Sequence, residues 1–127
     1  MKFALLLYED DTEREVKSDD EVAHCLAYAE AMQKAGILVG GERLRPARSA
    51  VTVRIRDGAS RVLDGPYAEA KEQLGGFHLI DVPDRGTALA WARRSPSTLR
   101  GRVEVREISE FVSKAMESLR HREGTPH

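Results

Sequence analysis

The most informative stretch of the chain is DGPYAEAKEQLGGFHLIDV, residues 64–82. It opens as a turn, because Gly65 permits unusual backbone angles and Pro66 fixes φ. We expect a short helical or irregular piece over Ala68 to Leu74. The paired glycines that follow lead into a strand over Phe77 to Val82. The stretch therefore predicts a rigid turn followed by a strand.

The segments on both sides of this stretch complete an alternating pattern. Strands are expected at Lys2–Tyr8, Ile37–Gly41, Val51–Arg56, Arg61–Leu63 and Arg102–Ile108. Helices are expected from a Ser18 cap to about Ala35, from an Asp84 cap to about Arg94, and from Glu110 to His121. This order is a βαββαβ pattern with short strands inserted. It predicts an α+β, ferredoxin-like domain over residues 1–108, with an antiparallel sheet and two helices on one face. Residues 109–127 would form a C-terminal amphipathic helix and tail.

The first strand is apolar on both faces, with the odd residues from Phe3 to Leu7 on one and the even residues from Ala4 to Tyr8 on the other. Helices can cover one face, and a second subunit is the simplest cover for the other. We therefore expect a homodimer. Two further apolar rows are expected to point inward: Val22, Cys25, Leu26, Ala29 and Met32 on the first helix, and Val51, Val53 and Ile55 on the hairpin.

Composition excludes several classes of function. The chain has 127 residues, of which 41% are hydrophobic and 32% charged, as expected for one globular domain. Its 20 basic and 21 acidic residues give a net charge of −1, so no overall field attracts nucleic acid or an anionic membrane. A single cysteine excludes an internal disulfide and suits a reducing cytoplasm. We expect no membrane span, no metal and no cofactor, because the corresponding motifs do not occur.

Titratable side chains gather around the opening stretch. Asp64 and His78 are candidates for an acid and a base, and Glu69 and Lys71 for ligand contacts. If Phe77 and Leu79 met the helices, His78 would face the cleft between subunits, where its pKa could be tuned near neutrality. The alternatives are an architectural turn, a solvated charged face and a packed histidine in the dimer interface.

Arginines are concentrated just before this stretch. Arg43 or Arg54 could clamp a carboxylate or phosphate if its guanidinium reached the cleft. The alternative is a solvated hairpin surface, which is the ordinary environment of arginine.

Several runs together resemble one family. The run over residues 64–82 resembles the signature of the DGPF-domain proteins, within the larger YCII-related family, with Tyr67 where the family name has phenylalanine. GILVGGERL, TVRIRDG and ALAWARRSP also resemble the family pattern, and the similarity extends from Lys2 to Ile108. It implies a ferredoxin-like fold and a dimeric α/β barrel.

The same resemblance implies two kinds of function. Many DGPF-domain relatives are associated with extracytoplasmic-function sigma factors, and some YCII relatives use a His–Asp pair for lyase-like chemistry on small molecules. The position of that histidine falls near Cys25 here, and the neighbouring His24 points about 100° away on a helix. Asp64 and His78 are therefore the better candidates. We expect a small anionic ligand in the cleft at the dimer interface, with lyase-like acid–base chemistry; the alternative is a non-catalytic module that serves a sigma factor.

Overall fold

A computed structural model describes residues 1–10, 18–68 and 70–123 of the chain. In chain order the elements are β1 (Lys2–Asp10), α1 (Asp19–Lys34), β2 (Leu38–Arg43), η1 (Ala47–Ser49), β3 (Val51–Arg56), β4 (Ala59–Asp64), β5 (Glu72–Asp81), α2 (Arg85–Arg93), η2 (Pro96–Leu99), β6 (Gly101–Glu107) and α3 (Glu110–Glu123), where η marks a short 3-10 helix.

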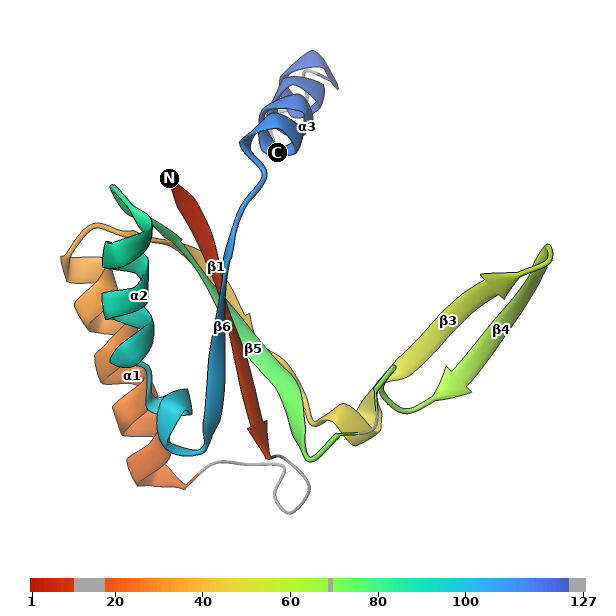
Figure 1. The fold of residues 1–127 in the computed structure, drawn as a ribbon, viewed down its shortest axis with the longest axis horizontal. Helices are drawn as coiled ribbons and strands as arrows, with labels where there is room; N and C mark the ends of the chain where they lie inside the picture. The colour runs from red at the N-terminus through yellow and green to blue at the C-terminus, as the bar shows by residue number, and fades with distance from the viewer. Residues whose placement is uncertain (11–17, 69, 124–127) are drawn as a thin grey trace.

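The main sheet has four strands in the order β2-β5-β1-β6, and each neighbouring pair is antiparallel. Figure 1 shows α1 and α2 side by side on one face of this sheet. The structure confirms the predicted α+β class, the antiparallel sheet and the two helices on one face, and it is consistent with a ferredoxin-like fold. The dimeric barrel stays a prediction, because the structure contains one chain.

The core lies between this sheet and the two helices. Phe3 and Leu5 of β1 are 2% and 0% exposed, which confirms the predicted alternation on this face of the strand. They form one buried cluster with Tyr28 and Met32 of α1 and Ile80 of β5, among others. The even residues of β1 lie on the opposite face, which none of the described helices covers (Figure 1).

α1 begins as predicted but is rotated from the expected orientation. The hydroxyl of Ser18 accepts a hydrogen bond from the Glu21 backbone N–H, as an N-cap residue does. The expected apolar row is wrong in part, because Val22 and Leu26 are 41% and 64% exposed. Tyr28, which the sequence pattern also assigns to the apolar row of this helix, is buried against the sheet. It is buried because its large ring follows Cys25 by three residues and precedes Met32 by four, so the three share one helix face.

Two strands are longer than the sequence pattern predicted. β5 begins at Glu72, so the helical or irregular piece expected as far as Leu74 is wrong in its last three residues. The sequence pattern also predicts a polar, acidic loop over Glu9 to Lys17, but β1 continues to Asp10, so Glu9 belongs to the strand. The reason is strand pairing, since Glu9 lies opposite Gln73 of β5 and also opposite Gly101 of β6. Residues 11–17 of the expected loop lie outside the described residues.

The hairpin formed by β3 and β4 is a separate two-stranded sheet that projects from the body of the domain (Figure 1). The Asp-Gly pair at Asp57-Gly58 is typical of a hairpin turn, and the structure confirms a tight turn there, with φ angles of 53° and 77°. The expectation that Val53 and Ile55 point into the chain's own core is wrong, because they are 64% and 73% exposed. The projection of the hairpin explains this, since it carries both faces away from the main sheet.

α3 is the helix predicted at the C-terminal end, and Figure 1 shows it standing clear of the main sheet. Its apolar residues are uncovered in the single chain; Phe111, for example, is 84% exposed. Among the helices of the described ranges, none has the length and apolar character needed to cross a membrane.

Candidate functional site

A pocket of about 340 Å³ lies between α1, the sheet and η2. This volume is sufficient for a small organic molecule. Its lining residues are Leu7, Cys25, Tyr28, Ala29, Leu38, Gly40, Gly41, Glu42, Arg43, His78, Ser95, Pro96 and Ser97. The walls are mostly apolar, and the polar side chains come from four separate parts of the chain. The pocket is formed within one chain, whereas the sequence led us to expect a cleft between subunits.

His78 contributes to the wall from the middle of β5. Its strand position is opposite Leu5, so its imidazole lies on the helix-covered face of the sheet. The ring meets the edge of Tyr28 at a centroid separation of 5.7 Å. The condition under which His78 would face a cleft between subunits, that Phe77 and Leu79 meet the helices, therefore does not hold, because the register of β5 against β1 places the alternate residues there.

The imidazole of His78 is desolvated. Burial lowers its pKa below the usual value, so the ring is neutral near pH 7. Its Nδ1 atom is buried and has no hydrogen-bond partner among the described residues. A buried polar atom without a partner costs free energy, which a bound water or ligand atom can recover. His78 is thus the group in the pocket best suited to take up a hydrogen bond or a proton.

Tyr28 closes one side of the pocket as a fixed wall. Its hydroxyl donates a hydrogen bond of 2.6 Å to the backbone carbonyl of Trp91 in α2. Burial raises its pKa to about 12, so the phenol stays protonated. On the opposite side, Gly41 lets β2 approach His78 closely, because a Cβ at Gly41 would overlap the carbonyl oxygen of Phe77.

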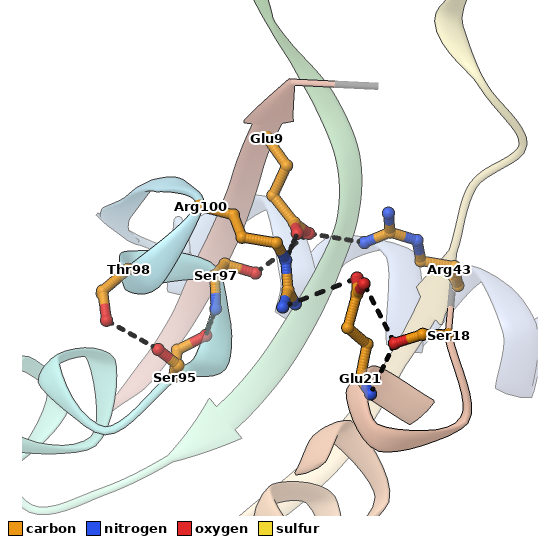
Figure 2. A network of polar contacts seen from close by, with 8 residues as sticks. All are labelled: Glu9, Ser18, Glu21, Arg43, Ser95, Ser97, Thr98 and Arg100. Carbon is orange, nitrogen blue, oxygen red and sulfur yellow. Dashed lines mark hydrogen bonds and ion pairs between the residues drawn. The ribbon is translucent and has the colours of Figure 1, made fainter. Parts of the chain in front are cut away.

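A buried carboxylate contacts two residues that line the pocket, Arg43 and Ser97, and Figure 2 shows these contacts. Glu9 is only 3% exposed. Its Oε2 accepts a hydrogen bond of 2.7 Å from Nη1 of Arg43 and one of 3.2 Å from the hydroxyl of Ser97. Its Oε1 accepts a hydrogen bond of 2.8 Å from Nε of Arg100. These contacts compensate for the burial of the charge, which would otherwise be costly.

The network continues from Arg100 to the start of α1. Nη1 of Arg100 lies 3.6 Å from Glu21, whose carboxylate also accepts a hydrogen bond from the Ser18 hydroxyl. Desolvation opposes the charge of Arg100, but the hydrogen bond and charge of Glu9, together with the charge of Glu21, outweigh it and raise its pKa. Arg100 therefore remains a permanent cation that ties β1 to the first turn of α1.

The structure brings together two of the six site residues expected from the sequence, His78 and Arg43, which both line the pocket. Asp64 and Arg54 lie exposed in the projecting hairpin and are not part of the wall. The Lys71 ammonium is also exposed and lies 4.0 Å from the Asp10 carboxylate. Glu69 lies outside the described residues. The expected pairing of Asp64 with His78 thus has no support in the pocket.

Sequence reasoning missed Glu9, Ser97 and Arg100. A signal for Glu9 was present, because it continues the alternation of Phe3, Leu5 and Leu7 on the buried face of one strand. A carboxylate at the end of such a row can be buried only if it is paired with a cation. No local signal in the sequence indicates that the cations come from the residue just before β6 and from the end of β2.

The pocket contains no ready-made metal site. In the ranges that the structure describes, no cluster of three or more His, Cys, Asp or Glu side chains could hold a metal ion. The donors that line the pocket instead suit an organic molecule with an apolar body and a polar end.

The fold and this pocket define a small ferredoxin-like α+β protein with space for a ligand between its helices and its sheet. The chain belongs to the YCII-related family, whose domain model matches residues 1–112. It is similar to the uncharacterized protein R00369 of Rhizobium meliloti (strain 1021), with 38% identity over 119 residues, which cover 87% of this chain and 94% of the relative.

The lowered pKa of His78 makes stability depend on pH. The unfolded chain binds a proton near the ordinary histidine pKa of about 6.5, whereas the folded chain resists protonation to lower pH. Stability is therefore fully present above that pH and falls as the pH drops toward the folded pKa. We compare pH 8 with pH 5, which lie about one to two units above and below the ordinary histidine pKa. Between these two pH values, we expect the unfolding free energy of wild type to fall by more than that of His78→Asn.

Chemical unfolding at the two pH values measures this difference. His24→Asn is the matched control for the substitution itself, because His24 is exposed on α1 and does not line the pocket. Parallel losses in wild type and His78→Asn would contradict the expectation.

Proposed function

We propose that this chain binds a small organic anion in the pocket between α1 and the sheet, and that His78 acts on it as a neutral hydrogen-bonding and proton-accepting group. The observation that carries the proposal is the desolvated imidazole in the wall of a ligand-sized, mostly apolar pocket. Arg43 at the same pocket supplies the positive charge for the anion. Enclosed pockets with a few convergent polar groups are the usual sites for small molecules.

The apolar walls favour a ligand with a compact ring or branched body. Leu7, Ala29, Leu38 and Pro96 offer surface to such a body, and the Tyr28 ring offers an aromatic face. At the polar end, Arg43 can meet a carboxylate. The proposed ligand class is therefore a small cyclic or branched carboxylic acid.

The proposal includes lyase-like acid–base chemistry on this ligand. A neutral imidazole can remove a proton from a bound molecule and return it in a later step, which accelerates such reactions by a factor of about 10² to 10⁴. Low pKa favours the neutral, proton-accepting form of His78 at physiological pH. Tyr28 is not the acid, since its hydroxyl is held by the Trp91 carbonyl and its pKa is about 12.

Titration with benzoate, followed by calorimetry and by amide chemical shifts, tests the binding step. We expect the largest shifts at Ala29, Gly41 and His78, which surround the pocket. His78→Asn should weaken binding by about tenfold, the effect of losing one good hydrogen bond in a dry site. His24→Asn, on the same helix as Ala29 but exposed, should bind like wild type.

Other results would remove parts of the proposal. Shifts confined to the projecting hairpin or to α3 would show that benzoate does not use the pocket. Equal affinity in wild type and His78→Asn would remove His78 from the site. A panel of other small cyclic carboxylates, screened in the same way, then ranks the members of the class.

A second candidate function, a non-catalytic interaction module, is favoured by the uncovered apolar residues of the hairpin and α3. Val53, Ile55 and Phe111 are 64%, 73% and 84% exposed in the single chain, and such surfaces commonly bind another protein. A sigma factor is the partner proposed from the sequence for such a module. A module of this kind would bind its partner equally well after His78→Asn.

A further inference from the structure

We infer that Glu9 is a positioning residue that holds the Arg43 guanidinium ready for the carboxylate of the ligand. This inference rests on the proposed function and adds to it the reason why the site would prefer a carboxylate over a neutral molecule of the same shape.

The first constraint on Arg43 is the buried carboxylate. Nη1 of Arg43 donates to Oε2 of Glu9 at 2.7 Å, and Glu9 is itself held by Arg100 and Ser97 (Figure 2). A guanidinium is planar, so fixing one N–H also fixes the directions of the others. The Glu9 carboxylate can stay in place while a ligand binds, because its hydrogen bond from Arg100 does not depend on the position of Arg43.

The second constraint is the backbone of β5. A Cβ built on Gly75 would lie 3.4 Å from each of Cζ, Nη1 and Nη2 of Arg43. Equal distances to these three atoms mean that the flat face of the guanidinium lies over Gly75. A methyl group at this position would be in ordinary van der Waals contact with the guanidinium, so the backbone of β5 limits how far the group can move toward the strand.

The remaining donors of Arg43 are available to a ligand. Within the described part of the chain, its side chain hydrogen-bonds through Nη1 alone, and it is 46% exposed. Nη2 and Nε can thus approach a carboxylate together, in the two-bond geometry that makes arginine selective for this group. Because the guanidinium is already ordered, less conformational entropy is lost on binding.

The test compares benzoate with benzamide, its neutral isostere, in three proteins: wild type, Arg43→Lys and Glu9→Gln. We expect wild type to prefer benzoate. Arg43→Lys should reduce this preference by about tenfold, since lysine retains the positive charge but lacks the planar pair of donors. Benzamide affinity should stay the same in all three.

Glu9→Gln separates positioning from simple charge. If Glu9 acted only as a negative charge beside the pocket, its neutralisation would strengthen benzoate binding. A positioning role predicts weaker benzoate binding instead, because Arg43 loses its anchor. Unchanged or stronger benzoate binding by Glu9→Gln, with wild type binding normally, overturns the inference but leaves the proposed function standing.

A measurement without ligand decides the case in which no probe binds. Nitrogen-15 NMR of the arginine side chains should show slower rotation of the Arg43 guanidinium in wild type than in Glu9→Gln, with its signals assigned by their loss in Arg43→Lys. Failure of both probes to bind wild type removes the proposed function. Equal rotation rates in wild type and Glu9→Gln overturn the positioning role itself.

Discussion

Replacing Met32 with alanine is expected to lower the free energy of unfolding by about 2–5 kcal/mol. Met32 is 0% exposed and belongs to the cluster that joins α1 to β1 and β5. Its truncation removes apolar contacts and leaves a cavity that the sheet cannot fully close. Urea unfolding followed by the fluorescence of Trp91 measures the effect, since this is the one tryptophan of the chain and lies next to the same core.

Leu26→Ala is the matched control for Met32→Ala. Both residues are on α1, but Leu26 is 64% exposed. Its replacement should change the unfolding free energy by no more than about 0.5 kcal/mol, as is usual for exposed positions. Losses of similar size in the two variants would mean that α1 is rotated from the orientation described above.

Replacing Gly101 with alanine is expected to destabilise the protein by about 3 kcal/mol, the upper end of the usual cost of overpacking. A Cβ at this position would overlap the carbonyl oxygen of Tyr8 and lie 3.0 Å from Cα of Glu9. Both neighbours are backbone atoms, so the clash cannot be relieved by a change of rotamer. β6 would have to separate from β1 just where Glu9 is buried.

Gly86→Ala provides the control of opposite sign. Gly86 lies in the first turn of α2, and a Cβ there would meet Asp84 Oδ1 at an ordinary 3.5 Å. Alanine should stabilise the protein by about 0.4–1 kcal/mol, because it restricts the unfolded chain without a clash. Unfolding in urea compares the two variants, and a Gly101→Ala protein as stable as wild type would contradict the close approach of β6 to β1.

The candidate site was only partly predictable from the sequence. His78 and Arg43 could be singled out as a titratable group and a cation, and both line the pocket. Asp64 was expected beside His78 because the two are close in sequence, but β4 belongs to a different sheet. Glu9 was missed because its acidic neighbours suggested a loop, whereas pairing with two strands draws it into the core.

Local signals in the sequence determined the class of fold. The capping residues Ser18 and Asp84 begin the two helices that cover the sheet, and the Asp57-Gly58 turn closes the hairpin. The two apolar rows of β1 predicted a strand with one face packed against helices. Each of these features depends on residues a few positions apart, so the chain itself contains the information.

The tertiary structure alone decided which faces meet. Alternation along a strand separates two sets of residues, but it is the same pattern whichever set faces the helices. Only the register of β5 against β1 turns His78 toward Tyr28. In the same way, only the meeting of three distant segments gives Glu9 its two arginines. Long-range pairing therefore places the pocket within the chain, where sequence periodicity had indicated a cleft between two subunits.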